Sequence, residues 1–450
     1  MRYTALRLTR RSFLWAGGLS LALSAAGANG QEVNPKPLPS ALPQPGKAEL
    51  PAPQMPPAAN HQEAVQRYTL GEALAVAHQN HPQLAALKAS MNAAVLKQKG
   101  LNEVSRIGGF LLSDIEDRKA QSDLGIRAAM AEFEQAQHEV TYAVVRNYYT
   151  VVYAREQQKV ARDFVEQLED NLARVRKILY DKEAKGIKGI TKDTEDKLKI
   201  ILEAARGRLI QAETGADRAR AALREAMGLE PGPKVDAADE VLPEIKASIS
   251  REVVIAHAAT RRGEVTLAQI GFEVTELEVK AQQSKRLSVM VGTYANGADI
   301  HARPVPYAQR EPDYKPGAIG PEMPPRLIGK RSTRAATAEQ YAERVAAAVR
   351  QARSLVGLEA DAAYSRFDEA TRKIAGFKEA SAAGKQLIER QREATGGSLT
   401  KEEVLTNEVS AVQAMAAYNE ALYDQIMALA NLERITAGGV TVKFPGRQCR

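Results

Sequence analysis

The feature that most constrains this 450-residue chain is a long apolar stripe near its end, within residues 396–439. Thr400 and Glu403 have the spacing of a capping box at the start of a helix. Gly438 and Gly439 suit the end of that helix. Between the caps, apolar side chains recur at intervals of three and four residues, with Asn419 in the one gap: Leu405, Val409, Val412, Ala416, Tyr423, Ile426 and Ala430. This period predicts a helix that buries one face along another long helix.

A second stripe of the same kind lies in the first half of the chain. After turn-forming residues 186–191, the apolar positions are Leu202, Ala205, Leu209, Ala212, Ala216, Ala219, Leu223 and Ala226. Each stripe follows another long helical run, at residues 124–183 and 335–395. We therefore predict two copies of one helical hairpin, with tips near residues 184–191 and 395–400. Two unrelated coiled-coil hairpins with a common type of turn would give the same pattern.

The long run in the first copy has an apolar stripe of its own: Phe164, Leu168, Leu172, Val175 and Leu179. A continuous helix over residues 125–183 is roughly 90 Å long at about 1.5 Å per residue. Such a helix needs neighbours along its whole length, which predicts an elongated bundle and an oligomer. Pro82 and Gly263 mark places where the first helix of each copy is expected to be kinked or interrupted.

Four segments of the chain together carry a family pattern. They read Tyr-Thr-Leu-Gly-Glu-Ala-Leu through Asn-His-Pro-Gln-Leu at 68–84, Asn-Tyr-Tyr with Ala-Arg-Glu-Gln at 147–157, Ala-Ala-Leu-Arg with Gly-Leu-Glu-Pro-Gly at 221–232, and Tyr-Asn-Glu-Ala-Leu-Tyr with Ala-Leu-Ala-Asn-Leu-Glu-Arg at 418–434. These segments resemble the TolC-like family of outer-membrane efflux proteins. Each segment is a short helical pattern, and their order, spacing and duplication make the resemblance specific. It spans residues 67–440.

The resemblance implies a mainly α fold, in which two repeated antiparallel coiled-coil hairpins form one protomer of an elongated α-barrel. Members of the family insert two β-strands into each repeat, and the protomers share one membrane barrel. In the second repeat, residues 287–294 and 326–330 are the candidate strands. The first repeat offers only residues 106–112, whereas each membrane strand needs about nine to eleven residues. The chain is therefore expected to be a divergent member with short or degenerate β-strand insertions.

The ends of the chain differ in composition from the repeats. Four arginines precede a short apolar run that ends in Ala26-Gly27-Ala28, as in an export signal. Arg10-Arg11 fits a twin-arginine signal as well as an ordinary one. The predicted organisation is a signal peptide at 1–30, a Pro-rich disordered lead at 31–66, a first repeat at 67–232, a linker at 233–249, a second repeat at 250–440 with an insertion at 286–334, and a tail at 441–450.

Charge and motifs argue against nucleic-acid binding and catalysis. The net charge of +7 falls to about +3 without residues 1–30, which leaves 58 basic and 55 acidic residues interspersed along the helices. The single cysteine, Cys449, has no partner for an internal disulfide. His78 and His81 have helical spacing but lack the carboxylate of a metalloprotease helix. We therefore expect no enzyme activity, no metal and no cofactor, and a packing role for Tyr148 and Tyr149.

The resemblance implies a passive outer-membrane conduit for efflux or type I secretion, with most of the chain in the periplasm. It further implies a homotrimer whose hairpin tips dock on a periplasmic adaptor protein that an inner-membrane pump drives. We assign the adaptor contact to the tip residues Gly189, Ile190, Thr191, Gly397, Ser398, Leu399 and Thr400. Arg390 and Arg392 are candidates for polar gating contacts. Simple reversal of the helix direction would explain the same turns.

A periplasmic scaffolding coiled coil, derived from such a channel but lacking the membrane barrel, is the alternative function. The short first-repeat insertion favours it. An adaptor-like spacer protein is a third possibility, although no lipoyl-type β-domain is recognisable.

Overall fold

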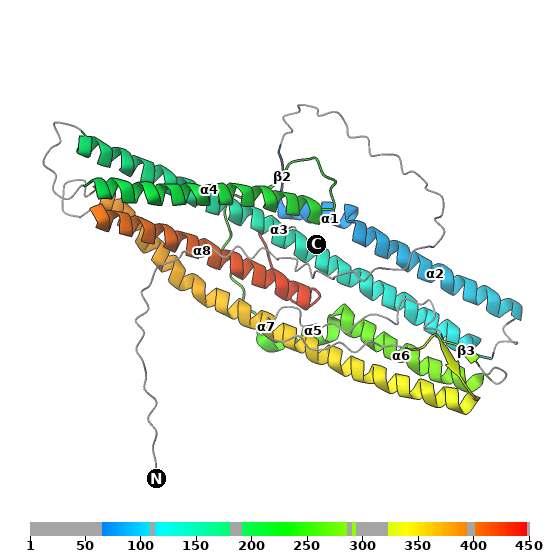
Figure 1. Cartoon of the computed structure of the whole chain (residues 1–450). Helices are drawn as coiled ribbons and strands as arrows, with labels where there is room; N and C mark the ends of the chain where they lie inside the picture. The colour runs from blue at the N-terminus through cyan, green and yellow to red at the C-terminus, as the bar shows by residue number, and fades with distance from the viewer. Residues whose placement is uncertain are drawn as a thin grey trace, which may run out of the picture. The chain divides into compact units, whose positions relative to one another are not determined.

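A computed structural model describes residues 65–108, 113–180, 191–285, 290–293, 323–393 and 401–447. All of these residues belong to one compact unit. The helices are α1 (Leu70–Asn80), α2 (Pro82–Gly108), α3 (Ile115–Tyr180), α4 (Lys192–Ala226), α5 (Arg251–Arg261), α6 (Gly263–Ser284), α7 (Arg331–Glu393) and α8 (Lys401–Ile435) (Figure 1). The strands are β1 (Gln66–Tyr68), β2 (Val235–Ala237), β3 (Met290–Gly292) and β4 (Arg326–Ile328).

The two halves of this unit repeat one helical pattern. Each half begins with an 11-residue helix, α1 or α5. The next helix has 27 residues in α2 and 22 in α6. The long helix has 66 residues in α3 and 63 in α7, and both closing helices, α4 and α8, have 35. The predicted fold of two repeated helical hairpins is therefore confirmed.

A break separates the first two helices of each half, where the sequence predicted one. Thr69 and Glu72 form a capping box at the start of α1, with Thr69 N donating to Glu72 Oε2 at 2.8 Å. His81 alone lies between α1 and α2, because Pro82 has no backbone N–H to continue the first helix. Arg262 occupies the corresponding place between α5 and α6.

The long helix α3 is covered by different partners along its length. Its first part packs on α2 and α6, where Leu124 and Ala128 contact Ile270 and Val274. Its last part packs on α4 and α8. The helix α7 packs on α5, α6 and α8. Helices far apart in the sequence therefore lie side by side in one layer (Figure 1).

The predicted apolar stripes form the cores of the hairpins, by two kinds of packing. In the first hairpin, Leu168 and Leu172 of α3 join Leu198 and Leu202 of α4 in one buried cluster. The second hairpin relies on small residues, since a Cβ on Gly384 of α7 would lie 3.0 Å from the Cα of Ala411 in α8. In the second hairpin, α7 and α8 therefore approach closely enough here for backbone atoms to be in contact, whereas large apolar side chains fill the first hairpin.

The stripe predicted for α8 is narrower than its buried surface. Ile426 and Ala430 are buried as expected, but residues 428–433 are buried all round. The chain after α8 turns back at a positive φ of Ala437 and Gly438, and buries Val442 and Phe444. Because this segment is covered on several sides, a pattern with one apolar face predicted too few buried residues.

Tyr148 and Tyr149 of α3 are fully buried and pack as the sequence suggested. Their rings meet edge to face at 5.3 Å between centroids, and the Tyr149 ring lies 5.7 Å from Phe444. Tyr153 stacks on Tyr423 of α8 at 4.6 Å. These rings join α3 to α8 and to the segment that follows α8.

The structure corrects two predicted boundaries in the first repeat. Residues 106–108, part of the candidate strand 106–112, belong to helix α2. Helix α3 begins at Ile115, ten residues before the expected start at residue 125. Its first turns bury polar side chains, including Gln121 and Ser122, so that no apolar period marks them. Residues 109–112 lie outside the described part.

Short strands close each half at different places. Parallel pairing joins β1 to β2, in a segment expected to be only a linker. Antiparallel pairing joins β3 to β4, with Met290 opposite Ile328, inside the two segments predicted as strands. Among the described helices, none has both the length and the apolar character needed to cross a membrane.

Gly228 gives a direct test of the hairpin closure after α4. It has a φ of +68°, and an added Cβ would lie 2.8 Å from the Cα of His81 at the α1–α2 break. We expect Gly228→Ala to lower the free energy of unfolding by about 1–3 kcal/mol, because both strain and overlap with backbone oppose it. Equilibrium unfolding in urea measures this change.

Gly215→Ala is the matched control, since Gly215 lies within α4 and has open space around its Cβ position. That change is expected to leave stability equal or to raise it by about 1 kcal/mol. Equal stability of the two variants would contradict the closure described here.

Candidate functional site at the hairpin tips

The ends of four helices lie together at one end of the layer (Figure 1). They are the last turns of α3 and α7 and the first turns of α4 and α8. Of the predicted adaptor-contact residues, Thr191 is described and is the N-cap of α4. Gly189, Ile190, Gly397, Ser398, Leu399 and Thr400 lie outside the described residues.

A buried carboxylate organises the tip of the first hairpin. Glu195 is 3% exposed, and its Oε1 accepts from Arg176 Nε at 3.0 Å and lies 2.9 Å from Lys199 Nζ. Its Oε2 accepts from Tyr180 Oη at 3.0 Å. Lys199, then Arg176 and Tyr180, lower the pKa of Glu195 to about 2. The cluster ties the last turn of α3 to the first turns of α4.

The pKa of Glu195 predicts how acid weakens this tip. A carboxylate whose folded pKa is lowered stabilises the protein above its unfolded pKa near 4.5, and loses that effect as pH falls toward 2. The stability difference between the native protein and Glu195→Gln should therefore be constant above about pH 4.5 and shrink below it. Urea unfolding at several pH values measures it, and a difference that is unchanged by acid would contradict the assignment.

A hydrogen bond between side chains joins the two hairpins near their tips. Asn171 Nδ2 of α3 donates to Glu408 Oε2 of α8 at 2.8 Å, in a part-buried position. Arg390, predicted as a gating residue, is exposed and donates to Gln386 Oε1 of its own helix at 3.2 Å. The side chain of Arg392 lies outside the described part of the chain. The contact between hairpins was missed, because a lone Asn and Glu among many charged residues give no sequence signal.

A part-buried ionic network joins three helices farther from the tips. Arg434 of α8 donates to Glu139 of α3 and to Glu359 of α7, both at 2.7 Å. Glu359 also accepts from Arg262, the residue between α5 and α6. Burial raises the pKa of Glu359, but Arg262 and Arg434 outweigh that effect and lower it. The network fixes the break of the second repeat against both neighbouring long helices.

Removal of Arg434 should strongly weaken this joint. In Arg434→Met, Glu359 would keep Arg262 as a partner, and Glu139, which is 41% exposed, would lose its contact with α8. This change is expected to cost about 1.5–3 kcal/mol. Arg372→Met is the matched control, because Arg372 is 79% exposed and pairs with Asp368 on its own helix. That change should cost less than about 1 kcal/mol in the same unfolding measurement. Equal losses would show that the network is not a joint.

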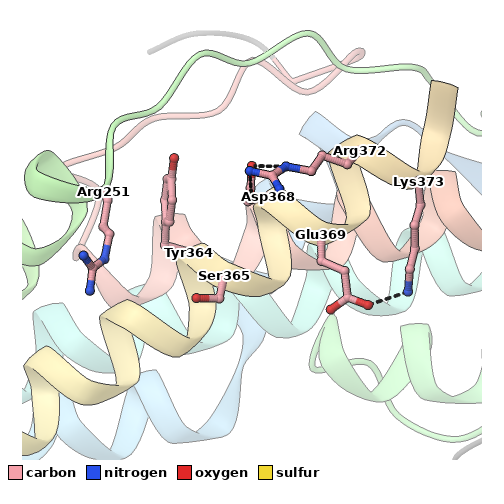
Figure 2. Close-up of a pocket in the computed structure, with 7 residues that line it drawn as sticks. All are labelled: Arg251, Tyr364, Ser365, Asp368, Glu369, Arg372 and Lys373. Carbon is pink, nitrogen blue, oxygen red and sulfur yellow. Dashed lines mark hydrogen bonds and ion pairs between the residues drawn. The ribbon is translucent and has the colours of Figure 1, made fainter.

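A hollow on the surface of α7 has a volume of about 490 Å³. Figure 2 shows the residues that line it: Arg251, Tyr364, Ser365, Asp368, Glu369, Arg372 and Lys373. Its charged groups pair with carboxylates, including Arg251 with Asp361 at 2.8 Å and Arg372 with Asp368 at 2.7 Å. They do not converge on one point as catalytic groups would.

The histidines singled out in the sequence are spread over different contacts. His78 Nε2 lies 3.0 Å from Thr141 Oγ1, a contact between α1 and α3. His81 lies at the α1–α2 break, where Gly228 packs against it. Within the described residues, no group of three His, Cys, Asp or Glu side chains could hold a metal ion.

Solved structures share this arrangement of helices. A membrane protein from Pseudomonas aeruginosa has a TM-score of 0.62 at 12% identity, over 84% of this chain and 98% of that chain. The open-state MtrE outer membrane channel of Neisseria gonorrhoeae has 0.60 at 14%, over 82% and 89%. The outer membrane protein VceC of Vibrio cholerae has 0.59 at 14%, over 83% and 97%.

No protein-family model and no curated protein matches the sequence. At identities of 12% to 14%, the similarity to solved structures establishes the fold. The chain has the fold of TolC-like outer-membrane channels, as the four sequence segments predicted.

Proposed function

We propose that the chain is an outer-membrane channel component of an efflux or type I secretion system. It would act as a passive conduit, with most of its residues in the periplasm. The observation that carries the proposal is the fold, which matches outer-membrane channels over more than four fifths of the chain. The contacts described above hold helices together, and we propose no enzyme activity for the chain.

An apolar face on α2 supports a homo-oligomer, which we propose to be a trimer. One side of α2 packs on α3 through Leu84 and its neighbours. The opposite side exposes Ala85, Ala89, Ala93 and Leu96, and Leu96 is 67% exposed. In this layer, α2 and α7 lie at opposite edges, because α3 and α6 separate them. A second copy that places its α7 edge on the α2 face would cover these side chains and close a ring of helices.

The hairpin tips are the proposed docking place for a periplasmic adaptor protein. The first hairpin ends with Thr191 as the cap of α4 and with the Glu195 cluster beside it. The second hairpin is joined to it through Asn171 and Glu408. A tip held by a few polar contacts can open without disrupting the apolar core of the hairpins. An inner-membrane pump would supply the energy for transport.

Fractionation of the native, untagged protein tests the channel proposal. We expect the protein to stay with the outer membrane through carbonate and urea washes, as an oligomer. Release of the protein into the soluble fraction would contradict the channel and favour the second candidate below.

Substitution at the tips tests the docking proposal. We expect a double replacement, Gly189→Leu with Gly397→Leu, to abolish efflux while leaving helix content and expression unchanged. Accumulation of a panel of dyes in cells lacking the native gene measures efflux. Gly207→Leu with Gly376→Leu is the control, since both glycines are helical, exposed and surrounded by open space. Normal efflux in the tip variant would contradict the docking assignment.

A periplasmic scaffold protein is the second candidate, and one observation favours it. Six residues, 109–114, connect α2 to α3, whereas 46 residues, 285–330, connect α6 to α7. The first repeat therefore cannot hold an inserted segment like that of the second. The fractionation experiment separates the two candidates.

A further inference from the structure

The segment between the two repeats crosses α3 and reaches α7. We call residues 235–249 the strap. It begins with β2, which pairs with β1, and buries Leu242 and Ile245 in the main core. Glu244 of the strap accepts from Lys378 Nζ of α7 at 2.6 Å. The strap is therefore bound to helices of both repeats.

Three side chains of α3 hold the strap by its backbone. Arg155 Nη1 donates to the carbonyl oxygen of Ala237 at 3.0 Å, and Arg155 Nη2 donates to that of Asp239. The N–H of Asp239 donates to Tyr148 Oη at 3.2 Å. The N–H of Leu242 donates to Glu156 Oε1 at 3.2 Å. These bonds must break together if the strap is to leave α3.

Two carboxylates at this contact each have one buried oxygen that accepts no hydrogen bond from the described residues. They are Glu156 Oε2 on α3 and Asp239 Oδ2 on the strap. The buried hydroxyl of Tyr149, near Asp239, also has no hydrogen-bond partner within the described part of the chain. A buried carboxylate with an unpaired oxygen is costly when ionised, and less so when it carries a proton. Burial raises the pKa of both groups, against the opposing effect of Arg155 and other neighbours.

The neighbouring charges come from every helix that packs on the strap. On α3, Arg155 and Lys159 face Glu156, while Tyr148, Tyr149 and Arg155 face Asp239. On α4, Arg220 Nε lies 3.4 Å from the strap carboxylate Asp236. Lys378 on α7 and Tyr418 on α8 face Glu244, and Tyr418 also faces Glu156. None of these described groups donates a hydrogen bond to Glu156 Oε2 or Asp239 Oδ2.

We propose that the strap is an acid-tightened clasp, in which proton uptake by Glu156 and Asp239 strengthens its hold on α3. When the strap is released, water solvates both carboxylates and their ordinary affinity for protons returns. A group with a raised pKa in the closed state favours that state increasingly as pH falls toward its ordinary value, 4.5 for Glu156 and 3.8 for Asp239. Opening of the strap is therefore suppressed by mild acid.

Hydrogen exchange of the purified full chain tests the clasp without reference to transport. Peptides that cover residues 236–245 report strap opening, and peptides of α6 serve as the internal reference. After correction for intrinsic rates, strap opening should fall on the order of tenfold between about pH 7.5 and about pH 5. An opening constant that is equal at both pH values would overturn the proposal.

Two variants identify the groups responsible. Glu156→Gln with Asp239→Asn should make strap exchange slow at both pH values, since neither side chain can ionise. Glu240→Gln is the matched control, because Glu240 is an exposed carboxylate of the same strap. It should keep the native pH dependence. A pH dependence that persists in the double variant would assign the effect to other groups and overturn the proposal. Neither result depends on whether the protein is a channel.

Discussion

The length of α3 and α7 is the constraint on which the rest of the structure depends. Helices of 66 and 63 residues are stable only if other helices cover them from end to end. No single partner does this. Shorter helices meet the need in pairs, α2 with α4 and α6 with α8 along α3, and the breaks at His81 and Arg262 divide the first two helices of each repeat. The duplication thus provides a second set of covering helices.

The two repeats use different chemistry at equivalent places. At the break of the first repeat, Gly228 packs its backbone against His81, so that shape alone fixes the joint. At the break of the second repeat, Arg262 enters an ionic network with Glu359 and Arg434. Close packing is insensitive to charge, whereas a network of buried ions is strong only while all partners are present. The joint of the second repeat therefore depends on each of its charged partners, whereas the joint of the first repeat depends on close packing.

Apolar periodicity predicted most of the fold, whereas segments that bury polar groups were not predicted. The stripes on α3 and α4 were predicted because Leu168 and Leu202 bury apolar surface at regular spacing. The first turns of α3 were missed, since Gln121 is buried through hydrogen bonds to Glu278 and Val274. The strap was not predicted either, because it is held on α3 by hydrogen bonds between its backbone and the side chains of Arg155 and Tyr148, and backbone groups carry no sequence signal. At the tips, the adaptor contact of Thr191 stays a prediction. The Glu195 cluster gave no sequence pattern, because its residues come from two helices that only the fold brings together.

Cross-linking between copies tests most directly whether this layer closes into a ring. Contacts of Gln98 with Asp123, Arg127 with Glu273 and Arg353 with Gln269 place Leu96 and Arg350 at about the same level on opposite edges. In a Cys449→Ser background, Leu96→Cys with Arg350→Cys should cross-link to a limiting species of three chains. Leu96→Cys with Phe377→Cys, a pair at different levels, should not. Monomers alone, or equal cross-linking of both pairs, would contradict the closed ring.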